Sequence, residues 1–128
     1  MNREDLNRMI CNIYSAQPEY LWKSAPSFAV YRHDSNKKWF AIIMDISKQK
    51  LGFSEDESVS VVNIKVDPSL VGTLLENEGI FPAYHMNKRH WVTVLLDENA
   101  TFEKIGWLIE MSYDNTRPNV ERKHSDIM

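Results

Sequence analysis

Two apolar segments constrain the fold of this chain most strongly: WFAIIMDI (39–46) and VSVVNIKV (59–66). Both are rich in the β-branched and aromatic residues that favour strands. Between them lies SKQKLGFSEDES, a polar stretch whose apolar residues do not recur at helical spacing. Two parallel strands would need a crossover connection, usually a helix, and this stretch does not have the pattern of one. The two segments are therefore predicted to be strands joined by a long hairpin connection.

Three further segments have the composition of strands, namely SFAVYR (27–32), IFPAYH (80–85) and HWVTVLLD (90–97). The turn HDSNKK links the first of them to residue 39, because Asp, Ser and Asn bend the backbone through their own side chains. The tetrapeptide MNKR is predicted to form a tight hairpin tip between the last two strands.

Three segments show the spacing of amphipathic helices: 3–15, a short segment that begins at Pro68, and 101–116. Before each segment stands a residue whose side-chain oxygen can accept a hydrogen bond from a backbone N–H group of the first helical turn. The predicted N-caps are therefore Asn2, Asp67 and Thr101. Gly79 stands where a C-terminal cap of the second helix would need positive φ.

The resulting element order is α-β-β-β-α-β-β-α, with strands joined by hairpins rather than by crossover helices. This order predicts an α+β two-layer sandwich, in which helices cover one face of an antiparallel sheet. We expect a single domain over residues 1–117 and a polar, frayed C-terminal tail over 118–128.

The charge balance restricts the ways in which the chain could bind a polyanion. Fifteen Lys and Arg residues against eighteen Asp and Glu residues give a net charge of −3, so any nucleic-acid site must be local. Cys11 is the single cysteine, which excludes an internal disulfide and a cysteine-rich zinc site. No apolar run is long enough for a membrane span, and no signal-peptide pattern opens the chain, so we expect a cytoplasmic protein with no membrane contact.

The segment PAYHMNKRHW (82–91) concentrates chemically versatile side chains. Zinc needs three or four ligands, and His85 and His90 are at most half of such a set, so no metal site is predicted. No Ser, Cys or Asp nearby forms a recognisable catalytic partner, and four glycines exclude a glycine-rich phosphate loop. We therefore predict no catalytic residue and no cofactor. In the simplest reading Asn87 bonds its own turn, the two cations are solvated and Trp91 is buried.

A hairpin tip with two cations is also a shape that contacts phosphates. In that interpretation Lys88 and Arg89 hold phosphate, while Asn87 and His90 fix the tip by hydrogen bonding. Two other turns could add positive charge through the residues Lys37, Lys38, Lys48 and Lys50.

Several stretches together resemble the MmcQ/YjbR family of small bacterial proteins. They are PEYLWKSAPSFAVYRH (18–33), KKWFAIIMDI (37–46), NIKVDPSLVGTLLENEGIFPAYHMNKRHWVTVLLD (63–97) and MSYD (111–114). The most specific block covers Tyr84, His85, Met86, Asn87, Lys88, His90 and Trp91. The resemblance implies a CyaY-like, secretion-chaperone-like α+β fold and a DNA-binding role, and it identifies no catalytic residue or cofactor.

Our leading hypothesis is a non-enzymatic protein that binds DNA through basic hairpin tips. The alternative is a protein-interaction or chaperone-like module, with a protein partner or a homodimer formed through the open sheet face or through Trp107 and Met111. An enzyme that uses His85 and His90 is the third hypothesis, and it requires both imidazoles to converge in a pocket beside an acidic residue.

Overall fold

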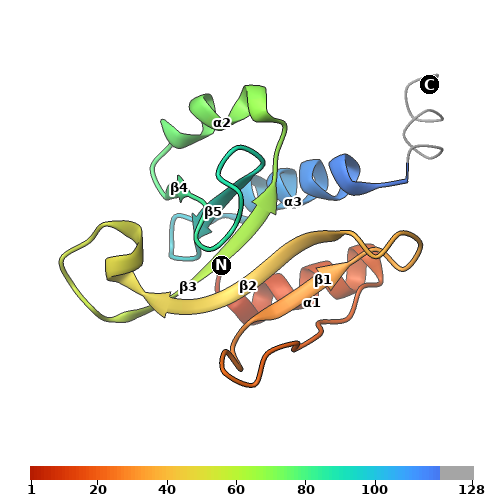
Figure 1. Cartoon of the computed structure of the whole chain (residues 1–128), viewed down its shortest axis with the longest axis horizontal. Coiled ribbons are helices and arrows are strands. Elements are labelled where there is room, and N and C mark those ends of the chain that lie inside the picture. The colour runs from red at the N-terminus through yellow and green to blue at the C-terminus, as the bar shows by residue number, and fades with distance from the viewer. Residues whose placement is uncertain (119–128) are drawn as a thin grey trace.

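A computed structural model describes residues 1–118 and contains one five-stranded antiparallel sheet of order β1-β2-β3-β5-β4 (Figure 1). The predicted α+β class and the predicted element order are confirmed, with one short 3-10 helix added after β2. The elements are α1 (Arg3–Tyr14), β1 (Ala29–Arg32), β2 (Trp39–Ser47), η1 (Lys48–Leu51), β3 (Ser58–Lys65), α2 (Pro68–Leu75), β4 (Ile80–Pro82), β5 (Trp91–Leu95) and α3 (Phe102–Thr116). Of the predicted tail, residues 119–128 lie outside the described part of the chain.

All three predicted N-caps are confirmed. Asn2 forms a reciprocal capping box with Asp5, Asp67 accepts from the Ser69 amide, and Thr101 accepts from the Lys104 amide. These bonds satisfy amides that have no partner inside the helix.

The predicted role of Gly79 as a helix cap is wrong. Helix α2 ends at Leu75 and its C-cap, Glu76, keeps a right-handed helical conformation. Gly79 has φ of +86° and instead turns the chain into β4, where its carbonyl accepts from the Leu95 amide. The positive φ that the sequence suggested is present, but it serves the sheet and not the helix.

Helices α1 and α3 cover one face of the sheet, and in Figure 1 both run behind the strands. Leu6 and Ile10 of α1 and Ile105 and Ile109 of α3 are fully buried against it. The link between the layers is partly polar, because the hydroxyl of Ser112 donates to the Phe40 carbonyl and accepts from the Lys65 amide at 2.8 Å. The main core therefore lies between these helices and the sheet.

The opposite face of the sheet is also apolar. A bulge lies where the pairing of β1 and β2 shifts between Tyr31 and Arg32. Beyond it the side chains of β2 alternate, so that Ala41 and Ile43 pack toward the helices while Ile42 and Met44 pack in a second cluster on the other side. Connecting segments and the short 3-10 helix η1, which contributes Leu51, cover this second cluster, and no α-helix of the described residues packs against it.

Both edges of the sheet are short or occupied. At the β1 edge, the amide and the carbonyl of Val30 bond to the carbonyl and the amide of Glu19, at 2.9 Å each. At the other edge, β4 spans Ile80–Pro82 and ends on a residue without an N–H group.

Within residues 1–118, no helix is long and apolar enough to cross a membrane.

Candidate binding pocket and basic end of the sheet

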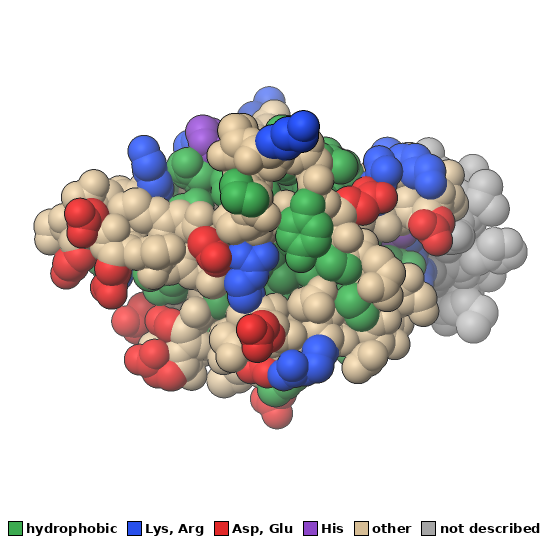
Figure 2. All heavy atoms as spheres, turned by 90° about the horizontal axis from the view of Figure 1, so that it is seen from below, with side chains coloured by type: hydrophobic (Ala, Val, Ile, Leu, Met, Phe, Trp, Pro, Cys, Tyr) green, Lys and Arg blue, Asp and Glu red, His purple; other side chains and the backbone are tan. Residues whose placement is uncertain are grey.

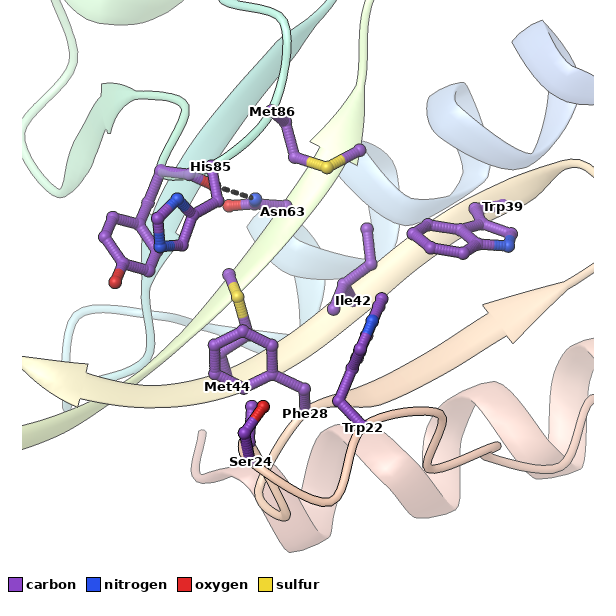
Figure 3. A pocket seen from close by; sticks show the side chains of 11 residues that line it. Trp22, Ser24, Phe28, Trp39, Ile42, Met44, Asn63, His85 and Met86 are labelled. Atoms are coloured by element: carbon purple, nitrogen blue, oxygen red, sulfur yellow. Dashed lines mark hydrogen bonds between the residues drawn. The ribbon is translucent and has the colours of Figure 1, made fainter.

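A pocket of about 320 Å³ opens on the sheet face that carries no α-helix (Figure 3). Ile42 and Met44 of β2 and Asn63 of β3 form its floor, which places their side chains on the same face of neighbouring strands. The walls come from two connecting segments, one of which contributes Trp22, Ser24, Ala25 and Phe28, and the other Tyr84, His85 and Met86; the ring of Trp39 completes them.

The aromatic side of the pocket consists of three rings, and the ring of Trp22 contacts each of the other two at a steep angle. Trp22 meets Phe28 at a centroid distance of 6.1 Å and Trp39 at 5.7 Å, with interplanar angles of 80° in both pairs. Edge-to-face contact is the arrangement that the charge distribution of aromatic rings favours. Trp22 remains 38% exposed, so its ring is accessible to a ligand.

Asn63 is the buried polar group of the pocket floor. Its amide nitrogen donates to the Tyr84 carbonyl at 2.8 Å, and its amide oxygen accepts from the hydroxyl of Thr93, the residue opposite it on β5. The Thr93 hydroxyl in turn accepts from the Tyr84 amide at 2.9 Å. Both backbone groups of Tyr84 are thus bonded to strand side chains, which fixes the wall segment against the sheet.

These bonds explain why the predicted strand 80–85 is too long. The strand β4 stops at Pro82, and Tyr84 bonds to side chains instead of continuing a backbone ladder. His85 then adopts φ of +59°, a left-handed conformation that places its ring on the pocket rim. Its ring lies 4.0 Å from that of Tyr84, measured between centroids.

The predicted turn at Asn87 is confirmed, although it belongs to a longer connection than a tight hairpin tip. The Asn87 side chain accepts from the Arg89 amide at 2.8 Å, and its carbonyl accepts from the amides of His90 and Trp91. Trp91 is buried in the second apolar cluster, as predicted.

The strand register decides which of the predicted basic residues share a location. Strands β2 and β5 both run antiparallel to β3, so the starts of β2 and β5 lie at one end of the sheet. Four exposed cations precede these starts, and we call them the basic end: Lys37, Lys38, Lys88 and Arg89. Because only β3 separates β2 from β5, the two groups stand about 10 Å apart in the strand-to-strand direction.

Lys48 and Lys50 lie elsewhere, at the far end of β2. Nine residues of β2 separate them from Lys38, which corresponds to roughly 30 Å of strand. Lys48 pairs with Glu57 at 3.4 Å and lies over the Phe53 ring. Figure 2 shows acidic side chains gathered at this end, where the β2–β3 connection lies on the left.

The two histidines also lie in different surroundings. His85 lines the pocket rim, whereas the charge of His90 acts on Asp67 at the start of α2. Hydrogen bonds from the Ser69 hydroxyl and amide lower the pKa of the Asp67 carboxyl, and the positive charge of His90 contributes to the same direction. No group of three or more His, Cys, Asp or Glu side chains within residues 1–118 could hold a metal ion.

The two residues proposed for a partner surface on α3 also differ from each other. Trp107 is 56% exposed, whereas Met111 packs against the main core. Trp107 and Met111 therefore do not form a joined, exposed apolar pair on this helix.

Sequence reasoning did not identify the pocket, and in particular it missed Trp22, Phe28, Trp39 and Asn63 as residues of one site. One signal was available. The strand 39–46 is apolar on both faces, whereas the helices of the predicted sandwich cover only one of them. A second apolar face without helices indicates either a cover of connecting segments or a binding surface.

The chain is similar to known proteins both in sequence and in structure. The family model YjbR matches residues 12–115. The chain is 35% identical to the uncharacterized protein YyaQ of Bacillus subtilis, over 91% of this chain and 99% of that protein. A crystal structure of a Pseudomonas syringae protein is 44% identical and superimposes with a TM-score of 0.89, over 91% of this chain and all of the other. A Deinococcus radiodurans crystal structure is 25% identical, with a TM-score of 0.69 over 96% of this chain and 86% of the other.

Proposed function

The chain belongs to the YjbR family, and on that premise we propose that it is a non-enzymatic nucleic-acid-binding protein that contacts phosphates with the basic end of its sheet. The observation that carries this proposal is the meeting of two basic turns, from different parts of the chain, at one end of β2 and β5. The relatives YyaQ of Bacillus subtilis and YjbR of Escherichia coli are uncharacterized proteins, so the proposal rests on geometry and charge.

The cations of the basic end are available to a ligand. Within the described residues, Lys37, Lys38, Lys88 and Arg89 form no ion pair, whereas Arg3, Arg32 and Lys48 each pair with a carboxylate. A paired cation must give up its partner before it binds phosphate, but an exposed and unpaired one exchanges only small counterions. The four side chains can therefore act together although the whole chain has a net charge of −3.

The uneven distribution of charge favours one orientation toward a polyanion. Glu55, Asp56 and Glu57 are exposed at the end of β2 that is remote from the basic end. A polyanion is repelled by these carboxylates and attracted by the basic end, so the molecule approaches with its basic end first.

Salt dependence gives the proposal a quantitative form. Four phosphate contacts predict a slope of log K against log salt of about −3.6 for a duplex and about −2.8 for a single strand. Fluorescence anisotropy of a labelled oligonucleotide at several salt concentrations measures this slope directly. Binding that is insensitive to salt would contradict a phosphate contact of this kind.

A matched pair of charge reversals locates the contact. Lys88→Glu and Lys50→Glu change the net charge equally, and both residues are exposed and without an ion pair among the described residues, but they lie at opposite ends of the sheet. Lys88→Glu is expected to weaken binding roughly tenfold, the loss of about one charge-assisted hydrogen bond. Lys50→Glu should change it less than about twofold. Equal effects of the two variants, or no binding by the unaltered protein, would contradict the proposal.

A further inference from the structure

We propose that the aromatic pocket takes one unpaired base of a single-stranded nucleic acid, while the basic end holds the neighbouring phosphates. This inference rests on the proposed function and assigns a ligand class to the sheet face that carries no α-helix. Its physical basis is the combination of ring faces, polar groups and adjacent cations at one place, and each of the three is provided by different residues.

The walls of the pocket suit a flat ring. In Figure 3, Trp22 is seen on edge between Phe28 and Trp39, with Ile42 of the pocket floor next to it. The pocket volume of about 320 Å³ exceeds the size of one base and is too small for a base pair together with its stacked neighbours. Stacking on aromatic side chains holds bases without regard to sequence, because every base has a π-face.

Polar groups stand where the edge of a base would be. Asn63 lines the pocket floor, and within the fold its amide uses one of two N–H donors and accepts one hydrogen bond, so it has capacity for one more bond of each kind. On the rim, neither the Ser24 hydroxyl nor the His85 ring forms a hydrogen bond within residues 1–118. A purely apolar ligand would leave these groups without partners, whereas the edge of a base offers both donors and acceptors.

Residues of the basic end lie close to pocket-lining residues in the sequence. Lys38 directly precedes Trp39, and Lys88 follows Met86 by two residues, so each basic turn begins beside a pocket-lining side chain. Adjacent Cα atoms are about 3.8 Å apart, which brings these lysine side chains within reach of the phosphates that flank a bound base. The positive charge of the neighbouring basic end therefore complements the phosphate backbone of a strand and not an apolar peptide.

A base inside a duplex cannot occupy this site. Its faces are stacked on neighbouring pairs and its edge is bonded to its partner, so entry would require unstacking and unpairing, which costs a few kcal/mol. The inference consequently predicts that a single strand binds more tightly than a duplex of the same length.

The test uses a labelled oligothymidylate of about twelve nucleotides, with tryptophan fluorescence and anisotropy as readouts. Trp22→Ala is expected to weaken binding by about fivefold to a hundredfold, the usual effect of removing one stacking ring. Trp22→Phe should keep most of the affinity, because the ring face remains. Trp107→Ala is the matched control, since it removes an exposed tryptophan from α3 and should leave the affinity unchanged. Equal unfolding midpoints of the three variants show that each is folded.

Specific results would overturn the inference. The first is that Trp22→Ala and Trp107→Ala bind the oligomer with equal affinity. The second is that a duplex binds as tightly as the single strand, or thymidine monophosphate as tightly as the oligomer. The third is that an equimolar apolar tripeptide displaces the oligomer. If Lys88→Glu and salt still weaken binding while Trp22→Ala does not, the pocket assignment alone is wrong. If no nucleic acid binds at all, the basic end is not a phosphate site either.

Discussion

Replacing Asn63 with Ala should destabilise the protein far more than the loss of one exposed amide would. Asn63 is 1% exposed, and its removal leaves the Tyr84 carbonyl without the Asn63 donor and the Thr93 hydroxyl without an acceptor for its proton. Each buried polar group without a partner costs about 1–3 kcal/mol, so the free energy of unfolding should fall by about 2–4 kcal/mol. A change of this size lowers Tm by about 10 °C in a chain of this length.

The control for this prediction is Asn36→Ala. Asn36 also makes two side-chain hydrogen bonds, to the Thr116 carbonyl at 2.8 Å and from the Lys38 amide at 3.0 Å, but it lies in a half-buried turn. Water can replace part of these bonds, so a loss of about 1 kcal/mol is expected.

Urea unfolding of both variants gives the two free energies, and hydrogen exchange at the Tyr84 amide reports on the wall segment. Exchange should be faster in Asn63→Ala, because Asn63 orients the hydroxyl that accepts from this amide. A cost of Asn63→Ala no greater than that of Asn36→Ala, with unchanged exchange at Tyr84, would refute the argument from burial.

Two further predictions concern the main core. Ser112→Ala removes a fully buried hydroxyl that bonds to backbone groups of β2 and β3, so we expect a loss of about 2–3 kcal/mol in urea unfolding; a loss below about 0.5 kcal/mol would contradict this. Burial, with the nearby carboxylates of Glu110 and Asp114, raises the pKa of Tyr14 to about 12 from 10.0. The fold therefore favours the neutral phenol, and this contribution is complete below pH 10.0 and lost as pH rises toward about 12. Alkaline unfolding curves of the protein and of Tyr14→Phe measure it, and coincident curves would show that Tyr14 contributes nothing.

Local patterns were sufficient to predict the elements of the fold. The caps at Asn2, Asp67 and Thr101 follow from side chains that can accept from the first amides of a helix, a purely local requirement. The strands β2 and β3 follow from residue types that fit a pleated surface. Errors occurred where a distant residue decided the conformation, as at Tyr84, whose backbone is held by side chains from β3 and β5.

The candidate site depends on register, which the sequence does not reveal. Trp22 and Asn63 are about forty positions apart, and only the order of strands in the sheet brings them to one pocket. The separation of Lys48 from Lys38, by contrast, follows from elementary topology. Successive hairpin connections lie at opposite ends of the strand they share, so the turns before and after β2 could never have formed one surface.

The margins of the sheet bear on the behaviour of this protein at high concentration. A sheet with an apolar face can stack into fibrils when one of its edge strands is free to pair with a strand from another copy. Here the outward groups of Val30 are already bonded to Glu19, and the other margin is three residues long and ends at Pro82. A second copy therefore finds no long free edge at which to add a strand, so the apolar face of the sheet is not combined with an edge on which a fibril could grow.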